Sequence, residues 1–135
     1  MLPEIDLREI KDADEHRKNT RHPFKWRVAI VFASIENEET YHGVTHDISS
    51  GGCAILTEHN VFSEEIVSVL ISLPVERPGG RRKVIEAQAR MVYTVLSAGH
   101  QKFRCGIQFL KFKGQGRKML MRAFAMRGIK IAPSS

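Results

Sequence analysis

Alternation of apolar and polar residues dominates the chain after Trp26. The clearest run lies between Val84 and Val95, where every second residue is apolar or small and most of those between are polar, the pattern of a strand with one buried face. The predicted buried face of this run consists of Ile85, Ala87, Ala89, Met91, Tyr93 and Val95. Further strands are predicted at 28–33, 40–46, 52–57, 66–73 and 103–109, separated by turn-forming segments. The pattern therefore predicts about six antiparallel strands in succession.

The period changes near the end of the chain. From Arg117 to Arg127, apolar residues recur at helical spacing, with Gly114 and Gly116 before them and Gly128 after them. The predicted buried face is Met119, Leu120, Ala123, Phe124 and Met126, and the opposite face is basic. We expect an all-β fold, a six-stranded antiparallel β-barrel with a C-terminal α-helix packed against it. The expected divisions are a flexible N-terminal arm (1–16), the barrel domain with its helix (17–127) and a tail (128–135).

Composition narrows the function classes. The 135 residues carry a net charge of +6, which favours an anionic partner without choosing among phosphates, nucleic acid and membrane. The charge is unevenly placed, since residues 4–15 hold six acidic side chains against two basic ones and no acidic residue follows Lys102. No apolar run approaches the roughly 20 residues of a spanning helix, and the N-terminus does not resemble a secretion signal. We expect a cytoplasmic protein without membrane insertion.

Metal chemistry is not expected. Cys53 and Cys105 fall inside strand patterns and are predicted to be small buried residues without a disulfide, and there is no CxxC pair for zinc. His42 and His46 would share a strand face but lie about 13 Å apart, too far to bind one ion. No catalytic motif is present, and Asp47, as part of an exposed turn, is not expected to have a clearly shifted pKa, so nothing marks it as a general base. We expect no enzyme activity.

A short polar segment, Asp47-Ile48-Ser49-Ser50-Gly51-Gly52, interrupts two predicted strands. Asp and Ser side chains bond backbone amides two residues on, and glycines allow positive φ, so a tight amide-rich turn is predicted. Such turns can bind anions, and a neighbouring carboxylate can accept hydrogen bonds from a base edge. By itself, the hexapeptide is more typical of an ordinary turn without a ligand. The basic run at Arg17 and Arg21 is by itself typical of a solvated surface.

Taken together, the two motifs are more specific. Arg17-x-x-x-Arg21, followed 26 residues later by Asp47-x-Ser49-x-x-Gly52, resembles the PilZ domain, a bacterial receptor module for the second messenger cyclic di-GMP. The resemblance covers roughly residues 15–127 and extends to the strands 86–95 and 106–109. It implies a six-stranded antiparallel barrel with a C-terminal helix, in agreement with the pattern above.

The resemblance also implies roles for individual residues. Arg17 and Arg21 would bind the phosphates and guanines of cyclic di-GMP, for which a guanidinium suits better than an ammonium. Asp47 would accept hydrogen bonds from a guanine, Ser49 would add a polar contact, and Gly52 would let the ligand approach closely. Further ligand contacts are expected at His16, Lys18 and Gly51.

In the family, the arginine-bearing arm folds over the bound nucleotide. Here that movement would shift the acidic stretch 4–15 and signal to an unidentified effector protein, with no cofactor besides the ligand. Binding near micromolar is expected, corresponding to about −8 to −9 kcal/mol. The number of nucleotides bound, the oligomeric state and the downstream output stay open.

Two alternatives remain from the residues. A basic β-barrel could bind RNA or single-stranded DNA, which needs a stacking platform for bases; Phe24, Trp26 and Tyr41 are the candidates for it. The chain could also be a protein-interaction module without a nucleotide, docking through its basic C-terminal helix.

Overall fold

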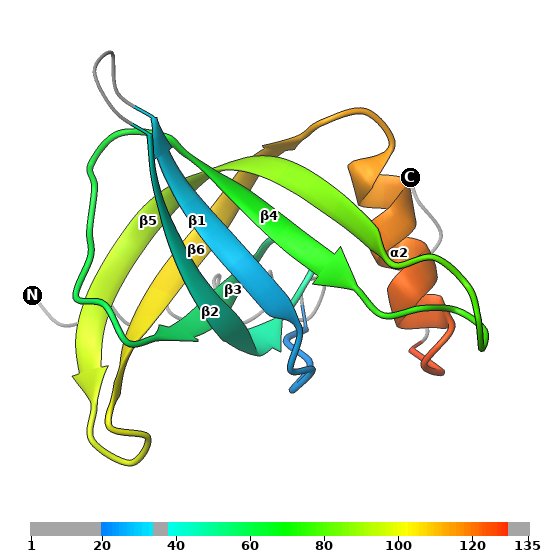
Figure 1. The fold of residues 1–135 in the computed structure, drawn as a ribbon, viewed down its shortest axis with the longest axis horizontal. Coiled ribbons are helices and arrows are strands. Elements are labelled where there is room, and N and C mark those ends of the chain that lie inside the picture. The colour runs from blue at the N-terminus through cyan, green and yellow to red at the C-terminus, as the bar shows by residue number, and fades with distance from the viewer. Residues whose placement is uncertain (1–19, 34–37, 130–135) are drawn as a thin grey trace, which may run out of the picture.

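The computed structural model describes residues 20–33 and 38–129, which form a closed barrel with a helix at one end (Figure 1). The strands are β1 (Arg27–Ala33), β2 (Glu38–Ile48), β3 (Gly52–Thr57), β4 (Val67–Leu73), β5 (Lys83–Ser97) and β6 (Lys102–Phe112), and the helix is α2 (Gly116–Ala125). Their order around the barrel is β1-β2-β3-β6-β5-β4, and every neighbouring pair is antiparallel. The predicted fold class is confirmed. Within the described ranges, no helix has the length and hydropathy needed to cross a bilayer.

Strand β2 extends further into the polar hexapeptide than predicted. β2 was expected to end at His46, but it continues through Asp47 to Ile48, and a register shift lies between Thr45 and Asp47. Such a bulge inserts an extra residue and bends the strand. The prediction that Asp47 belongs to a turn was therefore wrong, because ladder pairing with Ala54 holds it at the end of a strand.

The alternation of β5 holds for only part of its length. Ile85, Ala87, Ala89 and Met91 are buried as predicted, but Tyr93 and Val95 are 36% and 49% exposed. A register shift between Met91 and Tyr93 reverses the faces, so that Thr94 turns inward and donates a hydrogen bond to the Val61 carbonyl. The predicted inward orientation of Tyr93 and Val95 was therefore wrong.

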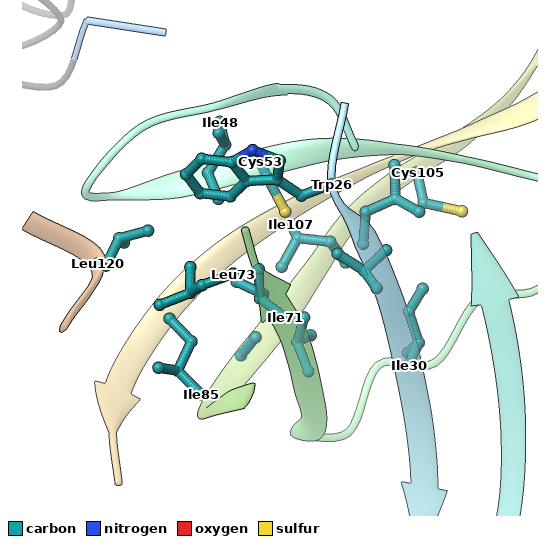
Figure 2. Close-up of a cluster of buried hydrophobic side chains, with 14 of the residues drawn as sticks. Trp26, Ile30, Ile48, Cys53, Ile71, Leu73, Ile85, Cys105, Ile107 and Leu120 are labelled. Atoms are coloured by element: carbon teal, nitrogen blue, oxygen red, sulfur yellow. The ribbon is translucent and has the colours of Figure 1, made fainter. Parts of the chain in front are cut away.

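Helix α2 closes one end of the barrel with its apolar side. Leu120, Ala123 and Phe124 are buried, and Figure 2 shows Leu120 pointing toward the cluster that contains Trp26, Ile48 and Leu73. The helix ends at Ala125, so Met126 lies beyond it and is exposed, contrary to the prediction. The predicted basic outer face is present, since Arg117, Lys118 and Arg122 are exposed.

An aromatic stack joins the segment before β1 to this helix. Trp26 is 7% exposed and stacks with Phe24 and Phe124 at ring-centroid distances of 5.3 and 5.8 Å. His22 meets the edge of Phe124 at 5.3 Å. Tyr41 packs against Phe32 and His59. Trp26 is thus part of the core and unavailable as a stacking platform, which weakens the nucleic-acid alternative.

Candidate functional site

The connection between β2 and β3 is a short turn in which Ser49 organises the backbone. The Ser49 hydroxyl accepts hydrogen bonds from the amides of Gly51 and Gly52 at 3.1 and 3.2 Å. The Ser49 amide donates to the Gly52 carbonyl at 2.8 Å. Ser49 itself is buried. The prediction that a serine side chain bonds backbone amides in this turn is confirmed, and the amides of Gly51 and Gly52 are therefore already occupied by the serine hydroxyl.

Gly52 has a structural reason to lack a side chain. A Cβ at this position would lie 2.2 Å from the Ile107 carbonyl oxygen of β6, which is far inside contact distance. The described residues with positive φ do not include Gly51 or Gly52, so the conformational freedom expected of them is not used. Gly52 therefore allows β3 to approach β6, and that pairing fixes the position of the turn beside Asp47.

Asp47 is the centre of a charged cluster on the outside of the barrel. Its Oδ1 accepts a hydrogen bond from Arg21 Nη1 at 2.7 Å. Its Oδ2 lies 2.8 Å from His46 Nδ1 and 3.5 Å from Arg104 Nη2. The Asp47 side chain is 13% exposed and that of Arg21 43% exposed. The cluster thus combines a nearly covered carboxylate with cations that reach solvent.

Opposing influences act on the pKa of Asp47. Burial raises this pKa, but the hydrogen bonds from His46 and Arg21, together with the charges of Arg21 and Arg104, outweigh burial and hold the pKa below its ordinary value. The expectation of an unshifted pKa was wrong, because Asp47 is more covered and better paired than a turn residue would be. Asp47 is therefore an anionic acceptor at neutral pH, the form needed to accept two N–H groups of a guanine.

Arg21 is placed by its neighbour in the chain. The amide of His22 donates to the Ile48 carbonyl at 2.8 Å, and the amide of Ile48 donates to the His22 carbonyl at 2.9 Å. This isolated bridge pins the chain next to the end of β2 and directs Arg21 onto Asp47. The two sequence motifs, 26 residues apart, therefore meet in space through Arg21 and Asp47. Arg17, His16 and Lys18 lie outside the described residues.

Arg104 was not predicted as a site residue. It lies on β6 opposite Leu56 of β3, 57 residues from Asp47. Its Nε atom is buried and has no hydrogen-bond partner within the described part of the chain. Alternation with Phe103 and Cys105 indicates an outward side chain. Only the register of β3 with β6 shows that this side chain reaches Asp47.

His46, which the sequence brought forward as a candidate metal ligand, belongs to the Asp47 cluster. Its ring contacts Asp47 and meets the His100 ring edge-on at 5.5 Å, and the Lys25 ammonium donates to the His46 carbonyl at 2.9 Å. His100 comes from the β5–β6 turn, far away in sequence. The contact between His100 and His46 could therefore not be predicted from the pattern of residues.

The cysteines and histidines show no metal centre in the ranges that the structure covers. A search of the described residues finds no group of three or more His, Cys, Asp or Glu arranged to hold an ion. Cys53 and Cys105 are free and buried, as predicted, and burial raises the pKa of both thiols. Both cysteines therefore contribute to the core as small apolar side chains.

Comparisons with known proteins define the class. The PilZ domain model matches residues 15–125, and the chain belongs to the PilZ domain family. No curated protein matches it in a sequence comparison.

Solved structures agree with this fold. The Bacillus subtilis inhibitor of motility, MotI/DgrA, superposes with a TM-score of 0.65 at 20% identity, covering 83% of this chain and 51% of that one. The chain thus spans about half the length of that protein. The PilZ domain of YcgR from Escherichia coli, solved with c-di-GMP, has a TM-score of 0.54 at 16% identity, covering 83% and 92%. The PilZ domain of CeSA from a cellulose-synthesizing bacterium has a TM-score of 0.51 at 20% identity, covering 79% and 97%.

Proposed function

We propose that this PilZ domain is a receptor for cyclic di-GMP and that the ligand binds over the Asp47 cluster. Membership of the family supports the proposal, as does the fold shared with a YcgR domain that was solved with c-di-GMP. The observation that carries it is the 2.7 Å ion pair between Arg21 and Asp47, because it brings the two motifs into one site.

The ligand is two guanosine monophosphates joined through two phosphodiesters, so it offers both anions and guanine edges. Arg21 and Arg17 supply the guanidinium groups, which bind phosphate oxygens in a fork and also pair with guanine O6 and N7. Asp47 accepts from the guanine N–H groups. Arg21 and Asp47 are already in contact, so the ligand replaces their mutual bond with one partner for each.

Ser49 and Gly52 contribute chiefly through the backbone. The Ser49 hydroxyl holds the turn amides in place, and Gly52 permits close pairing with β6, so that both keep Asp47 at a fixed position relative to β3. Ser49 adds a polar contact for the ligand once its turn relaxes. Additional ligand contacts are proposed for His16, Lys18 and Gly51.

The signal passes through the chain before Arg21. When Arg21 moves from Asp47 to a phosphate, the arm ahead of it closes on the nucleotide and carries the acidic stretch 4–15 with it. Ordering this arm costs conformational entropy, which sets affinity near micromolar. The repositioned arm then contacts an effector protein. The proposed divisions are an arm of residues 1–16, a barrel domain with its helix at 17–127 and a tail at 128–135.

The proposed function involves no chemical step. A general base works best with a pKa close to the working pH, whereas the pKa of Asp47 is held below its ordinary value by its cationic neighbours. The same property makes Asp47 a good permanent acceptor. The domain therefore binds its ligand and releases it unchanged.

Calorimetric titration tests the proposal. Cyclic di-GMP is titrated into the wild-type chain, into Arg21→Ala and into Arg81→Ala, whose side chain is exposed on the β4–β5 connection and is not among the described partners of Asp47. Saturable binding by the wild type and Arg81→Ala, with a loss of about 30-fold or more in Arg21→Ala, is expected from removal of a charged fork. GTP should give no saturable heat. A folded wild type that does not bind cyclic di-GMP would overturn the proposal.

A further inference from the structure

A groove of about 380 Å³ lies on the outside of the barrel beside the Asp47 cluster. Strands β1, β2 and β3 form it, together with the first residues after β3 and the start of β6. Residues that line it include Arg27, Val44, Leu56, Glu58, His59 and Lys102. Ligand sites in proteins typically measure roughly 300 to 1,000 Å³, so this groove is large enough for part of a nucleotide but small for a whole cyclic dinucleotide.

The sheet register places the lining of the groove close to the Asp47 cluster. Val44 pairs with Leu56, and Leu56 pairs with Arg104, whose guanidinium reaches Asp47. Ala54, the partner of Asp47, precedes Leu56 by two residues. Two residues of strand span about 7 Å, so one ligand can reach from Asp47 into the groove.

The chemistry of the groove repeats that of the cluster. Val44 and Leu56 form an apolar floor, on which a purine face can lie. Arg27 and Lys102 supply two positive charges, and Glu58 supplies a carboxylate. Unlike Asp47 and Arg21, which bind each other, these three charged side chains make no hydrogen bond or ion pair with any other described residue. Among the described residues, nothing therefore takes up their binding capacity.

We propose that this groove binds the second guanylate half of the cyclic dinucleotide. The inference rests on the proposed function and extends it to a second recognition point. With one guanine held at Asp47, the other lies on Val44 and Leu56, and Glu58 accepts its N–H groups. Arg27 and Lys102 bind the phosphodiester on that side. The domain thus reads both bases, one with each carboxylate.

Cyclic GMP–AMP separates the two recognition points. This ligand can place its guanine at Asp47 and its adenine in the groove, where adenine cannot donate the same pair of N–H groups to Glu58. We expect the wild type to bind cyclic di-GMP at least tenfold more tightly than cyclic GMP–AMP. The two equivalent orientations of the symmetric ligand account for only about twofold of this preference.

Glu58→Ala tests the assignment by calorimetry with both ligands. The affinity for cyclic di-GMP should fall about tenfold, while that for cyclic GMP–AMP changes less than twofold, so that the preference between them nearly disappears. Glu64→Ala, at an exposed glutamate of the β3–β4 connection outside the groove lining, is the matched control and should behave as wild type. Arg27→Ala should weaken both ligands by about tenfold, because both carry the phosphates.

The outcomes separate this inference from the proposed function. If the wild type binds cyclic di-GMP through Arg21, but Glu58→Ala and Arg27→Ala match the wild type with both ligands, the groove assignment fails and the receptor function stands. If the wild type binds both ligands equally, reading of the second guanine is excluded. If the wild type binds neither ligand, both proposals fail. Thermal unfolding of each variant confirms that these exposed substitutions leave the fold intact.

Discussion

The segment from Arg21 to Trp26 is held differently at its two ends. At one end, Trp26 is buried between Phe24 and Phe124, and its amide donates to the Thr45 hydroxyl at 2.8 Å. At the other end, the half-exposed Arg21 holds Asp47 through an ion pair. Apolar burial is lost only by opening the core, whereas a partly hydrated ion pair contributes about 1 kcal/mol or less and exchanges readily.

This difference indicates where the domain is fixed and where it can respond. The aromatic end anchors the segment to α2, so the chain from His22 onward keeps its place when a ligand arrives. The charged end can exchange one partner for another without loss of the fold. Under the proposed function, ligand binding should therefore rearrange Arg21 and the residues before it, while the barrel stays as it is.

Trp26→Ala should break the anchored end and have the largest effect. Removal of a buried aromatic side chain lowers the free energy of unfolding by about 3 to 5 kcal/mol. Urea denaturation measures this loss, and Trp26→Phe, which keeps a ring in the stack, should recover part of it. Unchanged stability in Trp26→Ala would contradict the role of the aromatic stack as an anchor.

Gly52→Ala should disturb the pairing of β3 with β6, on which the position of Asp47 at the charged end depends. Its Cβ would meet the Ile107 carbonyl, and the resulting shift of β3 should cost about 1 to 3 kcal/mol of stability and also displace Asp47. Gly99→Ala is the matched control, because a Cβ there meets nothing within 4 Å and its φ is not positive. We expect the control to unfold at the wild-type urea concentration or slightly above it. Equal stability of the two variants would show that the close pairing of β3 with β6 is not required.

Arg21→Ala should affect ligand binding much more than stability, unlike substitution at the aromatic end. We expect a loss of less than about 1 kcal/mol in the free energy of unfolding, since the ion pair is partly hydrated. Cyclic di-GMP affinity should nevertheless fall at least about 30-fold. Paired urea and calorimetric titrations on one protein preparation measure both quantities. A destabilisation as large as that of Trp26→Ala would mean that the charged end is also an anchor.

Acidification should produce the smallest effect. The pKa of Asp47 is lower in the folded chain than its ordinary value of 3.8, so its stabilising contribution is present above that value and is lost as the pH falls through the lower folded pKa. Below about pH 4, wild-type stability should therefore decline more steeply than that of Asp47→Asn. Urea midpoints measured across this range test the sign. A parallel decline of the two proteins would contradict the lowered pKa.

Local patterns were sufficient for the barrel and its helix because their signals are periodic and lie within single elements. The buried face of β4 follows from spacing alone, and so does that of α2 as far as Phe124. The register shifts at Thr45 and near Met91 could not be predicted, since a bulge depends on how a strand pairs with its neighbour rather than on its own residues.

Prediction of the site was limited in the same way, because part of it depends on how the strands pair. The resemblance to the PilZ family indicated Arg21 and Asp47, and the structure brings them together. Arg104 and His100 enter the cluster through the pairing of β6 and the position of its turn, which no short motif records. Glu58 likewise looks like an ordinary exposed residue until the structure places it in the lining of the groove.

Nitrogen-15 NMR titration with cyclic di-GMP tests the location of binding most directly. We expect saturable amide shifts at Arg21, Asp47, Gly51 and Gly52, extending to Val44 and Glu58 in the groove, with little change in β4 and on the outer face of α2. Shifts confined to α2 and the β4–β5 connection, or no shifts in a folded protein, would contradict this expectation.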